Sequence, residues 1–401
     1  MSEWKQYRLG EIVETNPRVL FDNNTNYPFI EMKDLDSDVK YVKPQVRREI
    51  KSGARFCNGD TLFARISPCL ENGKICQVKT LNPNEVGFGS TEFLVFRGKK
   101  NVTNSDFIYY LLKSEYIRNC AIQMMTGSSG RQRVERKSIE NLLVRIPDLA
   151  EQSEIAATLS AFDEKIDTNL EINKTIEAIN ESIFVEWFIN YNYPNSRHSN
   201  KINIPDGWET VPLKEVGEIV NGFAFKSGDY KSEGIRMIRS LNITTAGTIN
   251  NKSSVFLDNS QIKDHPSQYL EAYDYLMVMV GSSLGKQGIV RPYNLPALLN
   301  QNMWNFRLKN NHITRHYFNY YLKFNLNKYF NYASGSAISF VKKSDYYELP
   351  ILIPDKATLQ SFEKLASINE SKISANLEQN EILTSIRDSC ISRLIDVQLN
   401  R

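Results

Sequence analysis

The chain has 401 residues, of which 41% are hydrophobic and 24% charged, an ordinary composition for a globular protein of two or three domains. This composition excludes a disordered chain and a small disulfide scaffold. Residues 1–147 carry 23 Lys+Arg against 17 Asp+Glu and residues 204–354 carry 16 against 12, whereas residues 148–190 carry 2 against 10. Charge therefore indicates two polyanion-facing modules separated by an acidic connector, although ordinary surface charge remains an alternative.

The first half of the chain reads as a mixed α/β module followed by a long helix. Residues 61–66 and 93–96 have the β-rich composition of short strands between Gly, Asn and Pro turns. Apolar residues at spacings of three and four predict a helix over 105–124. Residues 148–191 continue such a spacing far beyond the length of a helix in a globular core, with a slip of register near its middle.

The second half repeats this order. Strands are expected at 275–280 and 305–308, and a helix at 314–332. A second long helix over 355–400 carries a less regular apolar stripe: Phe362, Leu365, Ile373, Leu377, Ile386, Cys390, Leu394 and Val397. Two long helices in one chain most simply pair antiparallel, because the second must return toward the first module. Two independent helices, each folded onto its own module, are the alternative.

Short strings of the first half recur in the second at a shift near 204 to 214 residues. Trp4 through Leu9 matches Trp208 through Leu213, and Gly59-Asp60-Thr61-Leu62 matches Tyr273-Asp274-Tyr275-Leu276. An internal repeat of this length predicts two copies of one domain. The expected domains are a first module at 1–147, a long helix and linker at 148–203, a second module at 204–354 and a second long helix at 355–401.

Sequence signatures of catalysis and of membrane insertion are missing. The string Gly281-Ser282-Ser283-Leu284-Gly285-Lys286 has too few residues between its glycines for a phosphate loop. His312 and His316 have the i, i+4 spacing of metal ligands but no third ligand, so we expect a pair on a helix surface and no metal. The five cysteines form no Cys-x-x-Cys pair, as in a reducing cytosol, and neither a secretion signal nor a long apolar run is present. We expect a cytoplasmic, non-catalytic protein.

In their order, the repeated strings resemble the DNA-specificity subunit of Type I restriction-modification systems over essentially the whole chain. The strings that carry the resemblance are Trp4…Leu9 and Trp208…Leu213, Gly59-Asp60-Thr61-Leu62-Phe63-Ala64-Arg65, Gly87-Phe88-Gly89-Ser90-Thr91-Glu92-Phe93, Gly127-Ser128-Ser129-Gly130-Arg131-Gln132 and Ile146-Pro147-Asp148-Leu149-Ala150-Glu151-Gln152. The second half departs from this pattern, since Ser334-Gly335-Ser336-Ala337-Ile338 lacks the arginines.

The resemblance implies an α+β (mixed α/β) fold of two similar target recognition domains, related by a pseudo-two-fold axis and separated by two long antiparallel coiled-coil helices. It also implies double-stranded DNA and two methyltransferase subunits as partners, with restriction/translocase subunits expected in addition. S-adenosylmethionine, ATP and Mg are then expected only in those partner subunits. Unlike modules imply an asymmetric target of two half-sites, with centres about 34 Å or somewhat more apart. Two alternatives stay open: a recognition subunit of an orphan or other modification system without a nuclease, and an enzyme with an unrecognised site.

Arg, Asn, Gln, Ser and Thr beside glycines are the natural readers of base edges, and Lys is suited to phosphates. The candidate DNA contacts of the first module are Arg65, Asn72, Lys74, Ser90, Thr91, Ser128, Ser129, Arg131, Gln132, Arg133 and Lys137. Those of the second module are Ser282, Ser283, Lys286, Gln287, Asn300, Gln301, Asn302, Ser336, Lys342 and Lys343. For each residue, the alternative is a solvated loop position or a phosphate contact that positions the protein without reading sequence. On the acidic first long helix, the stripe expected to bind the methyltransferase consists of Ile172, Ile176, Ile179 and Ile183; burial against its own module is the alternative.

Overall fold

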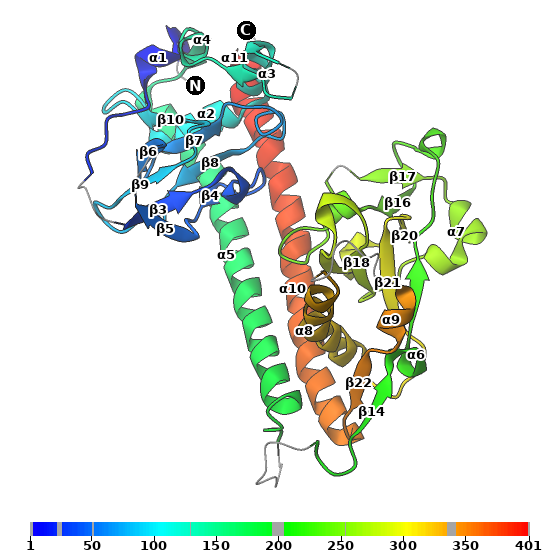
Figure 1. Cartoon of the computed structure of the whole chain (residues 1–401). Helices are drawn as coiled ribbons and strands as arrows, with labels where there is room; N and C mark the ends of the chain where they lie inside the picture. Colours follow the sequence, from blue (N-terminus) through cyan, green and yellow to red (C-terminus); the bar gives the residue numbers. More distant parts are fainter. Residues whose placement is uncertain are drawn as a thin grey trace. The chain divides into compact units, whose positions relative to one another are not determined.

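A computed structural model describes residues 3–21, 26–49, 52–128, 130–194, 204–252, 254–334 and 342–399 (Figure 1). The side chains of Ser282 and of residues 327–334 are excluded from that description. The chain divides into two compact units, one made of Met1–Glu171 with Gln379–Arg401 and the other of Ile172–Glu378. Each unit is one α/β module together with a segment of both long helices.

Sheets dominate the module of the first unit. A central sheet has the order β2-β10-β7-β8-β4, a second sheet has the order β5-β3-β9-β6, and β1 pairs with β13 and β11 with β12. The strands are β1 (Lys5–Arg8), β2 (Val13–Thr15), β3 (Asn26–Ile30), β4 (Tyr41–Val42), β5 (Val46–Glu49), β6 (Ala54–Cys57), β7 (Thr61–Ala64), β8 (Ile75–Val78), β9 (Val86–Gly89), β10 (Phe93–Gly98), β11 (Met125–Thr126), β12 (Arg133–Val134) and β13 (Leu143–Ile146).

Short helices complete this unit: α1 (Leu9–Ile12), a 3-10 turn at Met32–Asp34, α2 (Ser105–Lys113), α3 (Glu115–Gln123), α4 (Arg136–Glu140), a π-helical turn at Ser392–Asp396 and α11 (Val397–Leu399). The single helix expected over 105–124 is wrong, because Ser114 divides it. The backbone of Ser114 is extended and its hydroxyl accepts a hydrogen bond from the amide of Ile117, which caps a new helix. Helix α2 is apolar on most sides and lies in the core of the unit.

The module of the second unit has a four-stranded sheet of order β15-β21-β18-β19, a three-stranded sheet β17-β16-β20 and the pair β14-β22. Its strands are β14 (Glu209–Pro212), β15 (Gly217–Asn221), β16 (Ile235–Ile238), β17 (Val255–Leu257), β18 (Tyr275–Val278), β19 (Gln287–Ile289), β20 (Ala297–Leu299), β21 (Met303–Leu308) and β22 (Pro350–Ile353). Its helices are α6 (Leu213–Val216), α7 (Gln261–Asp264), α8 (Arg315–Ser334) and α9 (Lys343–Tyr347), with 3-10 turns at Ser227–Asp229, Ser240–Asn242, Pro266–Gln268, Gly281–Ser283 and Pro292–Asn294.

Equivalent buried ion pairs show that the two modules are copies. Asp60 and Asp274 precede β7 and β18 and are fully buried. Asp60 accepts two hydrogen bonds of 2.7 Å from Arg97 of β10, and Asp274 accepts bonds of 2.7 and 3.3 Å from Arg307 of β21. A buried carboxylate needs a cationic partner, and the same Asp–Arg ion pair meets this need at the same position of both sheets.

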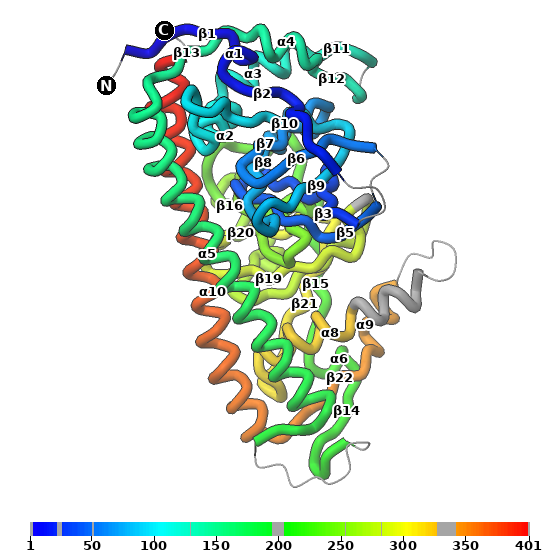
Figure 2. The backbone as a smooth tube through the Cα atoms, turned by 90° about the vertical axis from the view of Figure 1, so that its left-hand side faces the viewer, coloured from blue at the N-terminus to red at the C-terminus, as the bar shows by residue number. Residues whose placement is uncertain are grey.

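The long helices are α5 (Leu149–Phe188) and α10 (Lys356–Ile391), which run side by side in Figure 2. Within the first unit, Asp163 contacts Arg387 and Asn169 contacts Asn380. A rising number on one helix therefore meets a falling number on the other, so the helices are antiparallel, as expected. The predicted fold class, mixed α/β with two similar domains and two long antiparallel helices, is confirmed.

The surfaces at which the helices meet are more polar than the predicted stripes. The buried residues of α5 include Asp163, Asn169, Asn173 and Asn180. On α10, the expected core positions Leu365, Ile386 and Val397, the last just beyond the helix, are 42%, 43% and 45% exposed. The predicted α10 stripe is therefore wrong at these positions, because hydrogen-bonded polar residues occupy the contact instead.

No helix in the described part of the chain is long and apolar enough to cross a membrane.

Candidate nucleic-acid interface

A tight hairpin of the first unit carries the predicted Arg131, Gln132 and Arg133. Strands β11 and β12 pair antiparallel, and the turn between them uses Gly127 and Gly130 with φ of 123° and 76°. Side chains with a Cβ adopt such φ values rarely, so these glycines allow the tight turn. Arg131 lies in this turn, where its amide donates to the carbonyl of Ser128 over 3.0 Å, and its side chain is exposed.

The hairpin is joined to the loop that follows β7. The amide of Val134 donates to the carbonyl of Arg65 over 2.9 Å, and the amide of Ser67 donates to the carbonyl of Gln132 over 3.0 Å. The hydroxyl of Ser67 accepts in return from the amide of Gln132 at 3.1 Å. These bonds bring Arg65 and residues 131–133 together although they lie far apart in the sequence.

Two glutamates hold two of the predicted arginines. Glu92, in the turn between β9 and β10, accepts from Nε and Nη2 of Arg133 at 2.9 and 2.6 Å. Hydrogen bonding to Arg133 lowers the pKa of the Glu92 carboxyl, so it is ionised near neutral pH. Arg65 lies 3.4 Å from Glu135. Arg65 and Arg133 are thus oriented by carboxylates rather than extended freely into solvent.

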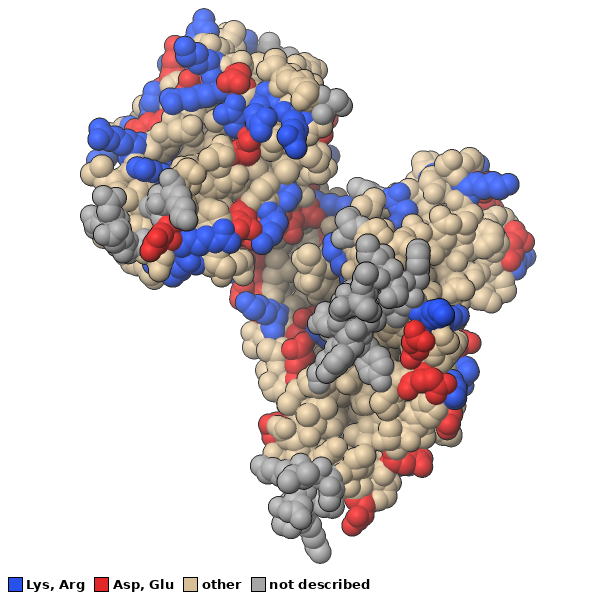
Figure 3. Space-filling view, in the orientation of Figure 1, with Lys and Arg blue, Asp and Glu red and all other residues tan. Residues whose placement is uncertain are grey.

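Among the arginines and lysines predicted for this unit, Arg131 and Lys137 lack such a restraint. Both side chains are exposed, and neither forms a hydrogen bond or ion pair within the described residues. Ser90 and Thr91 lie in the same β9–β10 turn as Glu92, where the Ser90 hydroxyl accepts from the Glu92 amide. Figure 3 shows that Lys and Arg side chains gather on the visible face of this unit. The surface formed by Arg65, Ser90, Thr91, Arg131, Gln132 and Arg133 is called the first recognition surface below.

Asn72 and Lys74 do not belong to the first recognition surface. They lie at the opposite end of the β7–β8 connection, and the ammonium of Lys74 donates to the carbonyl of Met32 over 2.8 Å. Asn72 is exposed. Lys74 is half-buried and anchors a turn, which is a structural role that the sequence did not indicate.

In the second unit, the turn at 300–302 lies beside the loop that follows β18. The amide of Met279 donates to the carbonyl of Asn302 over 2.9 Å, and the amide of Asn300 donates to the carbonyl of Ile238. A Cβ on Gly222 would lie 1.8 Å from the carbonyl oxygen of Asn300, so glycine permits this close packing. Gln301 is exposed, and Asn300 and Asn302 are half-buried. The neighbouring Ser283, in the turn at 281–283, is half-buried.

Lys286 and Gln287 lie away from that turn. Both line a cavity against α8 and the long helices. Lys342 is exposed at the start of α9, and the ammonium of Lys343 lies 5.8 Å from the ring centre of Tyr347. Ser129 and Ser336 lie outside the described residues, and so does the side chain of Ser282; Ser128 is exposed in the β11–β12 turn.

The four isoleucines predicted to bind a partner have unequal environments. Ile179 is 48% exposed, while Ile172 and Ile176 are half-buried. Ile183 packs against the core of the second module, which is the alternative weighed for this stripe. Ile386 of α10, which corresponds to Ile179 in the repeat, is also exposed.

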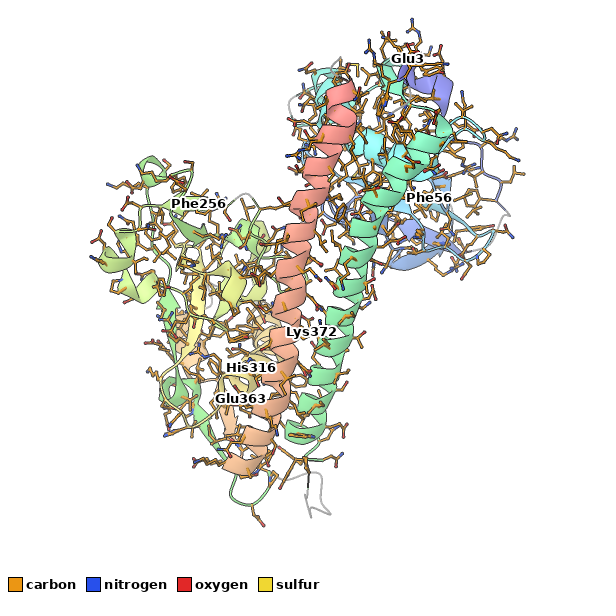
Figure 4. The ribbon with its side chains drawn as sticks, turned by 180° about the vertical axis from the view of Figure 1, so that it is seen from behind. Glu3, Phe56, Phe256, His316, Glu363 and Lys372 are labelled. Atoms are coloured by element: carbon orange, nitrogen blue, oxygen red, sulfur yellow. The ribbon has the colours of Figure 1, made fainter. Side chains whose placement is uncertain are left out.

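His316 differs from its expected place on a helix surface. It is 6% exposed, and its Nδ1 lies 2.7 Å from Glu363 of α10, as Figure 4 illustrates. Burial tends to raise the pKa of Glu363, but hydrogen bonds, first from His316, outweigh it and lower that pKa. Within the described residues, no group of three His, Cys, Asp or Glu side chains could hold a metal ion. The pair instead attaches α8 to α10.

Sequence reasoning missed Glu92, Glu135 and Ser67, which organise the first recognition surface. Glu92 lies inside one of the repeated strings, directly after Ser90 and Thr91, and an acidic residue there was the available signal. The pairing of Glu92 with a residue some forty positions away depends on the sheet and could not be read from spacing.

Comparison with known proteins supports the assignment of the modules. The sequence profile of the "Type I restriction modification DNA specificity domain" matches residues 1–178 and 205–379. The specificity subunit of the Type I restriction enzyme MjaVIII from Methanocaldococcus jannaschii is 27% identical over 391 residues, covering 92% of this chain and 85% of that protein. The specificity subunit of the EcoAI enzyme from Escherichia coli is 24% identical, covering 76% of this chain and 66% of that protein.

The solved structure of a Type I restriction-modification S subunit from M. genitalium has the same fold, with a TM-score of 0.57, 14% identity and coverage of 98% of this chain and 96% of that chain. Both relatives are named specificity subunits of Type I restriction enzymes, which agrees with the family that the sequence resembles. With two matches that together span most of its length, the chain belongs to the family of Type I restriction-modification DNA specificity proteins.

Proposed function

We propose that this chain binds double-stranded DNA and reads an asymmetric, bipartite target for a Type I restriction-modification complex. The observation that carries the proposal is the β11–β12 hairpin, which projects Arg131 beside the oriented Arg65 and Arg133. Arginine recognises guanine through two acceptors in the major groove, and a narrow hairpin can enter that groove.

Differences between the two modules support an asymmetric target. The first recognition surface contains three arginines, whereas the turn at 300–302 presents amide side chains. Amides pair with adenine and arginine with guanine, so the two modules favour different bases. Lys137 and Lys342 are exposed point charges suited to phosphates.

The long helices are proposed to dock two methyltransferase subunits, with restriction/translocase subunits joining through them. Ile179 and Ile386 expose apolar surface at equivalent positions of the repeat. The acidic charge of residues 148–190 disfavours contact with a phosphate backbone and leaves that surface for protein. S-adenosylmethionine, ATP and Mg belong to those partner subunits in this proposal, and the cytoplasm is the compartment in which the complex meets its DNA.

Mapping of methylated adenines by single-molecule sequencing, in cells with and without the gene, tests the proposal. We expect a bipartite motif with two unlike half-sites to lose its methylation when the gene is deleted. A continuous or palindromic motif would contradict it. The genes that flank this one distinguish a complete restriction system from a modification system without a nuclease.

Docking is tested separately by replacing Ile179 and Ile386 with Asp. Because both side chains are exposed, the double variant should fold and bind DNA while losing co-purification of the methyltransferase. Leu143→Asp, at another exposed apolar residue, is the matched control. Unchanged co-purification of the Ile179/Ile386 variant would refute this docking surface.

A further inference from the structure

The second unit contains a cavity of about 380 Å³ between its module and its long helices. Its lining comes from the loop at 244–247, strand β19, helix α8, Glu177 of α5 and Glu370 of α10. This size suits a small molecule. The cavity lies within one unit and is separate from the turn at 300–302.

Arg291 lines this cavity with hydrogen-bonding capacity left over. The residue is 1% exposed, and its Nη2 lies 3.1 Å from Glu370. Its Nε and Nη1 have no hydrogen-bond partner among the residues that the structure describes. A buried donor without an acceptor costs about 1–3 kcal/mol, so these N–H groups favour an occupant that brings acceptor oxygens.

Glu370 bonds to Nη2 of Arg291 and, in this geometry, does not reach its Nε or Nη1. One carboxylate oxygen of Glu370 accepts from the hydroxyl of Tyr320 at 3.0 Å and the other from Arg291. Glu177 is 3.9 Å from Arg291, beyond hydrogen-bonding distance. Burial raises the pKa of the Glu177 carboxyl.

In the first unit, the carboxylate and tyrosine equivalent to Glu370 and Tyr320 lie beside an arginine whose nitrogens are all hydrogen-bonded. There, Asp163 corresponds to Glu370 and Tyr110 to Tyr320, and the hydroxyl of Tyr110 donates to Asp163. The buried guanidinium is Arg387, whose three nitrogens all have acceptors on Asp163, Asp388 or Asp38. Among the described residues, Arg387 of the first unit therefore lacks the unpaired N–H groups that Arg291 has in the second unit.

The charged side chains at this cavity lie close to one another. Arg291 lies 3.1 Å from Glu370, Lys323 lies 2.8 Å from Glu181, and Glu177 lies 3.9 Å from both Arg291 and Lys323. Lys286 lines the cavity and forms no ion pair within the described part of the chain. Lys286 is therefore available, together with Arg291, to a bound anion.

We propose that this cavity binds a small oxyanion, a carboxylate or phosphate group of a metabolite, through Arg291 and Lys286. Bound there, the anion would contact the module and lie against α5 and α10 at the same time. Lys286, a predicted DNA contact, would then serve this site instead.

The test is isothermal titration calorimetry of the full chain without DNA, with inorganic phosphate and acetate as probes and chloride at matched ionic strength as the blank. We expect one saturable site for at least one probe, with a Kd near 1 mM, corresponding to about 4 kcal/mol. Phosphate alone, acetate alone, or both identify the chemistry of the bound group. Absence of saturable binding by either probe would overturn the proposal.

Two variants locate the site. Arg291→Lys keeps a cation beside Glu370 but removes the spare guanidinium donors, and Ala246→Glu adds a carboxylate at an exposed lining position. Each should weaken binding at least about tenfold. The matched controls, Arg387→Lys and Ala357→Glu, should leave it unchanged. Equal affinities of all four variants and the original chain would show that the anion binds elsewhere and would refute the site.

Discussion

Replacement of Asp163 by Asn should destabilise the first unit strongly. The side chain of Asp163 is 1% exposed and that of Arg387 is not exposed at all, so their ion pair is screened from water. Lys113 is buried nearby, and the charge of Asp163 contributes to keeping it protonated. Asn would keep the size of the side chain and an acceptor for Tyr110 while removing the charge that balances these cations.

The expected loss is about 3–5 kcal/mol, because one partner of a buried pair would remain charged without compensation. Combining Asp163→Leu with Arg387→Met removes both charges, and this double variant should be more stable than Asp163→Asn alone. Asp167→Asn is the matched control on the same helix. Asp167 is 30% exposed and pairs with the exposed Lys43, so its loss should cost less than about 1 kcal/mol.

Hydrogen exchange measured by mass spectrometry suits this prediction, because it reports each unit separately. Peptides of the first unit should exchange faster in Asp163→Asn, and peptides within 204–354 should serve as the internal reference. Urea unfolding followed by circular dichroism would supply the free energies. Equal losses for Asp163→Asn and Asp167→Asn, or a double variant less stable than Asp163→Asn, would refute the reasoning.

Three further predictions concern DNA binding and pH. Arg131→Ala should weaken DNA binding at one half-site by about 1–3 kcal/mol, whereas Lys342→Ala should weaken binding to all sequences and reduce the slope of log affinity against log salt by about one. Fluorescence anisotropy measures both effects. An equal loss of affinity of Arg131→Ala for cognate and scrambled duplexes would contradict the assignment. Glu92→Gln removes a negative charge from the first recognition surface and should tighten non-specific binding at low salt, and an unchanged affinity would place Glu92 away from DNA. Burial lowers the pKa of Lys113 from 10.5 to about 8. Between these pH values the unfolded chain binds more protons than the folded chain, so the free energy of unfolding should rise with pH by up to roughly 3 kcal/mol. Lys113→Met should flatten the curve of urea midpoint against pH, and an unaltered curve would exclude Lys113 as the source of this dependence.

The repeat and the long helices could be predicted because their signals are regular. Matching strings such as Gly59-Asp60 and Tyr273-Asp274 mark equivalent strand starts, and both aspartates form the same buried pair. Apolar spacing continued too far for a globular-core helix. It was harder to predict where a side-chain hydrogen bond interrupts a helix. Ser114 interrupts 105–124 because its hydroxyl caps a helix, a choice that apolar spacing does not encode.

The candidate site was predictable in its residue types but not in its grouping. Arg65 and Arg133 come together through the bonds of Ser67 and Val134, which depend on the folded sheet. Lys74 carries the same charge as these arginines but turns to a backbone carbonyl. The residue type therefore indicates a candidate DNA contact, whereas the position of the residue in the folded sheet determines whether its side chain is free to contact DNA.

The long helices show why apolar spacing alone misplaced their contacts. Asn169 donates to Asn380 over 2.8 Å, and Asn376 donates to Asn173 over 2.7 Å, so two equivalent amide pairs lie where the helices meet. Apolar contacts tolerate sliding, but a displaced amide would be buried without its partner, so these pairs specify one register at some cost in stability. With polar residues used for register, apolar residues such as Ile386 remain on the outer surface. Polar residues at the helix contact thus explain both why apolar spacing mispredicted that contact and why apolar side chains such as Ile179 and Ile386 are exposed on the helices.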